Sequence, residues 1–169
     1  MRKSQFWIAY FLLLAAQLLL SNFANFTPYL TLTLLPVMVL CISIRINDVT
    51  AMLIAFATGL AVDWLGEGLL GLNALALVPV AYARTPVIRA IFGTELFARK
   101  EDFTVERHGI ERVGLALIIV QTLFLVLYIW ADGAGTRPFW FNAARFFASM
   151  AGSLVLSLLA LRSLASSHG

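Results

Sequence analysis

The N-terminal quarter of the chain contains an uninterrupted stretch, residues 4–44, of 41 residues without one Asp, Glu, Lys or Arg. A helix needs roughly 20 mostly apolar residues to cross a lipid bilayer. The stretch is too long for one such helix and long enough for two, and the Asn- and Pro-containing segment 21–28 favours a turn between them. The sequence therefore predicts spans at about 5–20 and 29–44, with Pro36 kinking the second.

The remainder of the chain has the same character. Of its 169 residues 61% are hydrophobic and 12% are charged, and the mean hydropathy is +0.90. Soluble domains are about 45–50% apolar and about 25% charged. Continuous apolar runs favour helices over the alternating pattern of a membrane barrel. The predicted fold is therefore an all-α membrane protein, one domain over residues 1–169, with further spans at about 46–65, 69–91, 113–131 and 139–161.

Basic residues predict the orientation, because the cytoplasmic loops of membrane proteins are enriched in Lys and Arg. With the N-terminus inside, ten of the 12 basic residues fall on the inner side, and only Arg137 and Arg145 fall on the outer side. Both termini and the charge-dense loop 93–112 are therefore expected in the cytoplasm. The loop mixes acids with bases, which indicates a solvated segment or a docking site for a cytoplasmic partner rather than a lipid-binding basic patch.

Residues 56–84 are almost wholly apolar, yet they contain two acids and four glycines. Asp63 falls near the outer end of the third predicted span, where a carboxylate needs water or a partner, and Asn73 is a suitable donor. The glycines fit a tight turn and close helix packing. The segment is either a wet extracellular turn or a braced hairpin that forms a partner or ligand surface. The candidate residues of this hairpin are Gly59, Asp63, Trp64, Gly66, Gly68, Gly71 and Asn73.

Arg145 lies several residues inside the sixth predicted span. It can extend outward to the membrane interface, or it can form an intramembrane ion pair with Asp132 or Asp63. A pair would lower the cost of placing both charges in the bilayer. Arg84 and Arg89, at the inner end of the fourth span, have a similar choice: they can snorkel to the headgroups, or one of them can pair with Asp48.

No residue pattern predicts catalysis, a cofactor or a metal. The histidines, His108 and His168, have no neighbouring ligand residues at metal spacing, and the single Cys41 cannot form an internal disulfide. No nucleophile–base pair accompanies Asp63 and Glu67. The net charge of +3 is small, and in a membrane protein basic residues first report orientation. We therefore expect no enzyme activity, no cofactor, no metal and no nucleic-acid partner.

The pattern G-x-x-x-D-W-L-G-x-G-x-x-G-L-N-A-L, from Gly59 to Leu75, resembles the central signature of MreD, a family of bacterial rod shape-determining membrane proteins. Members of that family typically show a glycine, an Asp at the end of a span, and a short turn. A Gly-Leu-His/Asn-Ala-Leu run then opens the next span. Chain length, the number of spans and a cytoplasmic N-terminus also match, so the resemblance extends over the whole chain at low resolution.

The resemblance implies a non-catalytic scaffold subunit of the machinery that elongates the peptidoglycan wall, in the bacterial cytoplasmic (inner) membrane. The implied partner is an MreC-like bitopic coiled-coil protein. MreB, the glycosyltransferase RodA and its transpeptidase would be indirect partners. The family is also similar in architecture to the six-helix substrate-binding subunits of energy-coupling-factor transporters. The alternative function is therefore a small-molecule (vitamin-like) binding subunit of a membrane transporter, although the first span lacks the small residues that suit such an assembly.

Overall fold

The computed structural model describes residues 3–23, 30–44, 46–67, 70–93, 109–133 and 136–166. Within these residues the chain is helical and contains no strand, so the predicted all-α class is confirmed. A short π-helix continues the third helix without a break. The elements are α1 (Lys3–Phe23), α2 (Leu35–Leu40), α3 (Asp48–Val62), η1 (Asp63–Glu67), α4 (Leu72–Phe92), α7 (Ile110–Gly133) and α8 (Phe139–Ser166).

Four of the described helical stretches are long and apolar enough to cross a membrane, which indicates a multi-pass membrane protein. They are Asp48–Gly66, Leu72–Phe92, Glu111–Gly133 and Phe139–Arg162. The apolar stretch in α1, Trp7–Phe23, is shorter by the same measure. Large hydrophobic side chains such as Phe11, Leu53 and Trp130 are exposed on these helices. Extensive exposed apolar surface of this kind suits contact with lipid.

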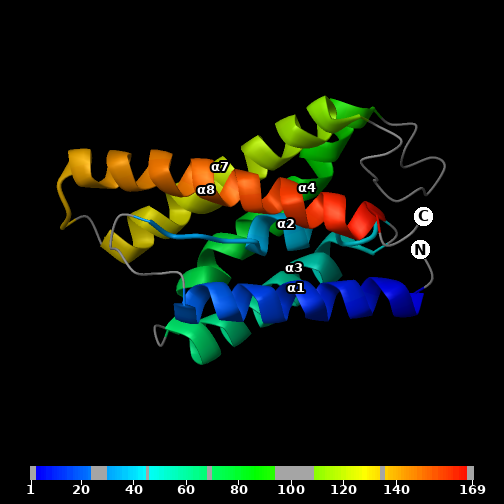
Figure 1. The fold of residues 1–169 in the computed structure, drawn as a ribbon, viewed down its shortest axis with the longest axis horizontal. Helices are drawn as coiled ribbons and strands as arrows, with labels where there is room; N and C mark the ends of the chain where they lie inside the picture. Colours follow the sequence, from blue (N-terminus) through cyan, green and yellow to red (C-terminus); the bar gives the residue numbers. More distant parts are fainter. Residues whose placement is uncertain are drawn as a thin grey trace.

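The helices run roughly along the long axis of the molecule (Figure 1). Sequence neighbours pack together, α3 against α4, α4 against α7, and α7 against α8. The short α2 lies in the middle of the bundle, and all six of its side chains are buried. The first turn of α1 and the last turn of α8 lie at the same end of the molecule. The predicted loop 93–112 lies largely outside the described residues, and α7 begins at Ile110.

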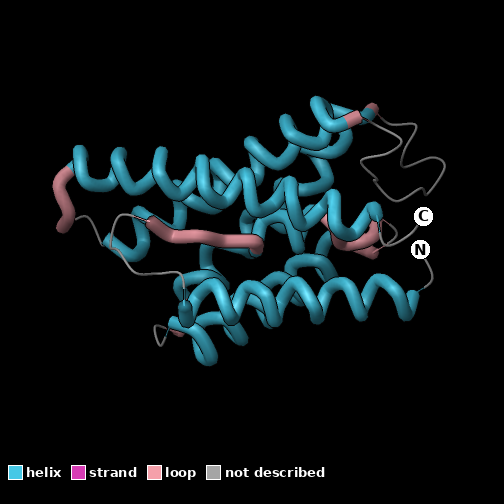
Figure 2. Tube along the Cα trace, viewed as in Figure 1, coloured by secondary structure: helices cyan, strands magenta, loops and turns pink. Residues whose placement is uncertain are grey.

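The second predicted span is not one helix. Residues 30–34 are non-helical and follow a nearly straight path between α1 and α8 (Figure 2). Only Leu35–Leu40 are helical, which gives a rise of about 9 Å. Pro36 lies in the first turn of α2, where the N–H groups have no helical acceptor and the missing N–H of proline is not needed. The prediction of a kink at Pro36 within a continuous span was therefore wrong, because Pro36 lies in the first turn of a short helix and not in the interior of a long one.

The non-helical segment 30–34 is held by serines of α8. The backbone N–H of Thr31 donates to Ser149 Oγ at 2.9 Å, and that of Thr33 donates to Ser153 Oγ at 3.0 Å. The hydroxyl of Ser153 in turn lies 3.3 Å from the carbonyl oxygen of Thr31. Non-helical backbone at membrane depth is tolerated only where it is buried and such groups replace the helical bonds. Serines four residues apart on one helix face supply them here.

Helix α1 supports the same segment from the other side. The side-chain oxygen of Gln17 accepts a 2.6 Å hydrogen bond from the backbone N–H of Leu34. The amide nitrogen of Gln17 donates to Ser21 Oγ at 3.2 Å, which fixes the orientation of the Gln17 side chain. Segment 30–34 therefore connects α1 to α8 through polar side chains, and these polar contacts occupy the interior of an otherwise apolar bundle.

Candidate functional site

Asp63 is fully buried where α3 passes into η1, and its carboxylate caps the start of α4. Oδ2 accepts from the N–H of Gly71 at 2.9 Å and of Ala74 at 3.3 Å. Oδ1 accepts from both the backbone N–H and the side-chain amide of Asn73, each at 2.9 Å. The first N–H groups of a helix have no helical partner and favour a negative charge. The predicted hydrogen bond between Asn73 and Asp63 is thus present, within a cap that also binds the N–H groups of Gly71 and Ala74.

A glycine at the N-cap position of α4 explains why a distant carboxylate is needed. Gly71 has no side chain that could cap the helix, and its φ of 98° lies in the left-handed region that glycine adopts readily. A Cβ at Gly71 would meet nothing within 4 Å. The requirement for glycine there is therefore conformational and not steric. Gly68, another predicted residue of this turn, lies outside the described residues.

Two other glycines of the hairpin allow close packing. A Cβ added to Gly59 would lie 2.5 Å from the Cα of Ala74, so the backbones of α3 and α4 touch at this point. A Cβ at Gly66 would lie 2.9 Å from the Cβ of Ser21, which places η1 directly against α1. Small residues at such crossings let membrane helices approach closely. The approach at Gly59 also brings Asn73 into reach of Asp63.

We expect Gly59→Ala to lower the free energy of unfolding by about 1–3 kcal/mol, because the added methyl group must separate two backbones. Gly114→Ala is the matched control, since a Cβ at this position in α7 would meet nothing within 4 Å. Alanine is favoured over glycine in helices by about 1 kcal/mol, so the control should be neutral or stabilising. Titration with sodium dodecyl sulfate in mild detergent measures both. Equal stabilities of the two variants would contradict the close approach.

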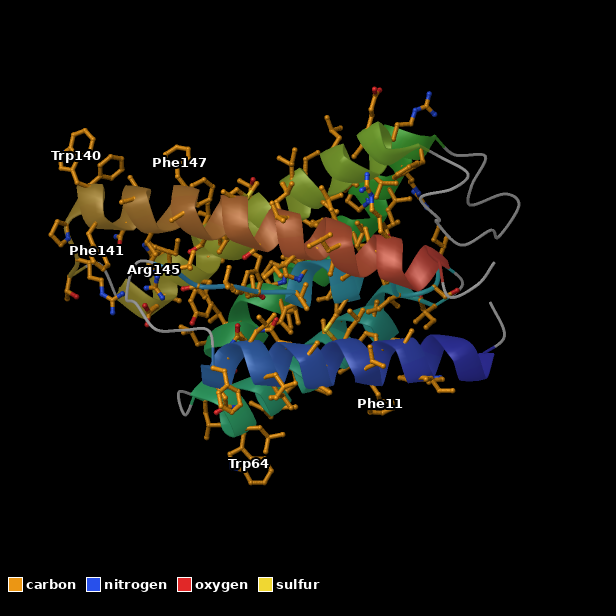
Figure 3. All side chains as sticks on the ribbon, in the orientation of Figure 1. Phe11, Trp64, Trp140, Phe141, Arg145 and Phe147 are labelled. Carbon is orange, nitrogen blue, oxygen red and sulfur yellow. The ribbon has the colours of Figure 1, made fainter. Side chains whose placement is uncertain are left out.

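The hairpin residues divide into an inner and an outer set. Asp63 and Asn73 are 0% and 2% exposed, whereas Trp64 is 75% exposed. Figure 3 shows Trp64 projecting away from the bundle. A wet extracellular turn therefore does not describe Asp63, which braces the hairpin from inside. Trp64 and the neighbouring Leu65, also exposed, form the surface that a partner or lipid can contact.

A second polar cluster surrounds Arg145 in the first turns of α8. Its Nη1 forms the predicted ion pair with Asp132, and this pairing resolves the choice between Asp132 and Asp63. Nε and Nη2 donate to Thr31 Oγ1 at 3.2 and 3.0 Å, and the guanidinium lies 5.7 Å from the ring centre of Tyr128. Arg137 also donates to Asp132, at 2.8 Å. All polar nitrogens of the buried Arg145 are therefore used within the bundle.

The cluster carries a net positive charge, since two guanidinium groups share one carboxylate. The Arg145 side chain is 8% exposed and points into the bundle, whereas that of Arg137 is 37% exposed (Figure 3). Trp140 and Phe147 point outward from the same part of α8. Aromatic residues at a span end are typical of the membrane interface. The cluster therefore lies close to one membrane surface and anchors segment 30–34 through Thr31.

An open groove of about 510 Å³ connects the two clusters at this end of the bundle. It lies between the start of α4 and the end of α7. Gly71, which donates to Asp63, belongs to it, and so does Asp132 of the Arg145 cluster. Most of its lining is apolar, so it suits an apolar segment better than a charged ligand. The lining residues are Leu70, Gly71, Leu72, Leu75, Ala131 and Asp132.

Arg84 has a role that the sequence did not reveal. It is 1% exposed, and its Nη1 donates to the carbonyl oxygen of Ile42 at 2.6 Å, directly after the end of α2. Ile42 lies beyond Cys41, the C-cap residue of α2, and a buried carbonyl outside a helix needs another donor of this kind. The snorkelling interpretation of Arg84 was therefore wrong. Asp48, the other candidate partner, accepts a hydrogen bond from Thr85 Oγ1.

The described residues contain no group of three or more His, Cys, Asp or Glu that could hold a metal ion. The chain was compared with protein-family models, with curated proteins and with solved structures, and no match was found in any of the three comparisons.

Proposed function

We propose that the chain is an MreD-like, non-catalytic scaffold subunit of the machinery that elongates bacterial peptidoglycan. It acts in the cytoplasmic (inner) membrane and controls cell shape by binding an MreC-like bitopic coiled-coil protein. Through this partner it associates with MreB, RodA and the RodA transpeptidase. The proposal gives the chain six membrane segments, of which the second is the broken unit of residues 30–44, and places both termini in the cytoplasm.

The strongest support for this proposal is the role of Asp63 within the signature segment, Gly59–Leu75. Four hydrogen bonds to Asp63 come from within the hairpin, so the carboxylate is occupied as a helix cap. A catalytic base or a ligand-binding acid needs a lone pair directed at its substrate. A residue that only braces a hairpin suits a scaffold, in which shape and not chemistry is required. The exposed Trp64 at the tip of the hairpin is then the direct contact.

The arrangement of the chain ends supports the proposed orientation. The start of α1 and the end of α8 lie at the same end of the molecule, as an even number of membrane segments requires (Figure 1). The topology predicted from the sequence assigns ten of the 12 basic residues to the side of these ends. Such an excess is the mark of the cytoplasmic side.

The transporter subunit remains the second candidate because the bundle has a polar interior. Broken membrane helices often form substrate sites near the middle of the bilayer in transporters, and the second segment here joins the non-helical residues 30–34 to the short helix α2. The amide of Gln121 and the hydroxyl of Ser157 are buried and form no hydrogen bond with the described residues. A small polar ligand could satisfy groups of this kind.

Affinity purification in mild detergent, followed by mass spectrometry, tests the two candidates. We expect a single-span coiled-coil protein to co-purify with the native chain, and Trp64→Ala to reduce its recovery about tenfold or more, as for a central interface residue. Trp130→Ala is the matched control, because Trp130 of α7 is 70% exposed and lies outside the hairpin. Recovery of ATPase subunits, or of a stoichiometric small molecule, would refute the scaffold and favour the transporter.

A further inference from the structure

We infer that the outward face of α4 is a docking surface for a membrane-spanning helix of another protein. The face consists of Leu75, Pro79, Tyr82 and Pro86, here called the α4 stripe. These residues recur at intervals of three and four, so they lie along one side of the helix. Leu75 and Tyr82 are 54% and 66% exposed. Pro86 is also exposed and Pro79 is partly exposed.

Tyr82 occupies an unusual depth for a tyrosine. It lies ten residues from each end of α4, which runs from Leu72 to Phe92, or about 15 Å from either end. The hydrocarbon core is about 30 Å thick, so Tyr82 is near its middle. Tyrosines of membrane proteins gather at the interfaces, where the hydroxyl reaches water. An outward hydroxyl at mid-span needs a polar partner, and lipid tails supply none.

The two prolines expose further polar groups on the same stripe. Proline has no N–H, so Pro79 leaves the carbonyl of Leu75 without its helical hydrogen bond, and Pro86 does the same to the carbonyl of Tyr82. In membrane helices such carbonyls are satisfied by neighbouring helices, nearby hydroxyls or water. Both carbonyls belong to exposed residues. The stripe therefore offers one hydroxyl and two acceptor carbonyls on a surface that faces outward.

Two other polar side chains at a similar depth form hydrogen bonds within the protein. Tyr10 of α1 is buried, and its hydroxyl lies 2.7 Å from that of Thr58 on α3. Thr122, near the middle of α7, donates to the carbonyl of Ile118 in its own helix at 2.7 Å. Within the described parts of the long helices, Tyr82 is the mid-span polar side chain that is both exposed and without a hydrogen bond. This contrast indicates that the α4 stripe is covered in the assembled protein.

The numbers of hydrogen-bond donors and acceptors on the α4 stripe indicate what kind of partner covers the stripe. Two copies of this chain that met through the stripe would bring four carbonyl acceptors against two hydroxyl donors, which is poor self-complementarity for a symmetric contact. A helix with an Asn, Gln, Ser or Thr opposite Tyr82 would supply the missing donors, and such side chains join membrane helices. Leu75 also lines the groove between α4 and α7, so a helix along the stripe continues into that groove.

The occupant is the single membrane span of the MreC-like partner, with an amide or hydroxyl side chain at mid-span. This assignment rests on the proposed function. It places the partner's span along α4 from the groove to Pro86, while Trp64 contacts the part of the partner that leaves the membrane. The two contacts are separate, so each can be removed alone.

A photo-cross-linking amino acid in place of Tyr82 tests the assignment in native membranes. We expect an adduct with the same single-span protein that co-purifies with the native chain. The matched control is the same amino acid at Phe56, which is 48% exposed near the middle of α3 and should give lipid adducts only. Tyr82→Phe, which removes only the hydroxyl, should reduce recovery of the partner about threefold, whereas Phe56→Leu should not.

The outcomes separate this inference from the proposed function. If the single-span protein co-purifies but residue 82 forms adducts only with lipid or with a second copy of the chain, the α4 assignment is overturned and the scaffold stands. If no such protein co-purifies, the scaffold fails. In that case an adduct of residue 82 with a span of a different, identified protein keeps the docking surface, and lipid adducts alone overturn both.

Discussion

Asp63→Ala will lower the free energy of unfolding by about 3 kcal/mol or more, the largest expected effect of any substitution in the hairpin. The change removes the acceptor of the N–H groups of Gly71, Asn73 and Ala74. Each buried donor without an acceptor costs about 1–3 kcal/mol. Loss of the negative charge at the start of α4 adds to the effect. Titration with sodium dodecyl sulfate, followed by circular dichroism, measures the loss.

Two further variants show whether the cap is the cause. Asp63→Asn keeps one side-chain oxygen and the size of the residue, so its stability should fall between those of the native chain and Asp63→Ala. Glu111→Ala removes an acid from the first turn of α7, where Glu111 is exposed. Its effect should stay within about 0.5 kcal/mol, as for most surface substitutions. Native stability of Asp63→Ala would show that the carboxylate does not hold the hairpin.

Asp132→Ala should be the second severe change, with an expected loss of about 3–5 kcal/mol. It leaves the cation of Arg145, whose side chain is 8% exposed, without its carboxylate, and breaking a buried pair from one side has this cost. The double variant Asp132→Ala, Arg145→Met removes both charges and should recover most of the loss. Arg137→Gln, at the exposed partner of Asp132, should cost about 1 kcal/mol or less.

The same unfolding titration gives the coupling between the two residues. If the losses of the two single variants simply add in the double variant, Arg145 and Asp132 do not act as a pair, and the ion pair has no energetic role. A large coupling free energy would instead show that the cluster joins α7 and α8 as one unit.

The long helices could be predicted from the sequence because each is a continuous apolar run, and the observed bounds of α3, α4, α7 and α8 lie within a few residues of those expected. The structure of the second span could not be predicted in this way. Apolar composition reports that a segment is buried but not that it is helical. The hydrogen bonds that replace helical bonds in segment 30–34 come from serines 118 and 120 residues away, and no local pattern indicates such partners.

The contacts of the candidate site could likewise be predicted only in part from the sequence. Asp63 and Asn73 were paired correctly because they are close in sequence and polar in an apolar segment. The ion pair of Arg145 with Asp132 was one of three alternatives, because charge alone could not choose between Asp132, Asp63 and the membrane interface. The bond from Arg84 to the carbonyl of Ile42 was missed, because every residue has a carbonyl and only the fold brings this one close.

Segment 30–34 also imposes an order on the biogenesis of the protein. Thr31 and Thr33 leave the ribosome 118 and 120 residues before the serines that bind them, a delay of about ten seconds at roughly 5–20 residues per second. During that time their N–H groups cannot be satisfied by lipid. Until α8 is made, these N–H groups therefore need another partner, such as water or a carbonyl of the same segment. The last described helix to be made is the one that completes the burial of the second segment.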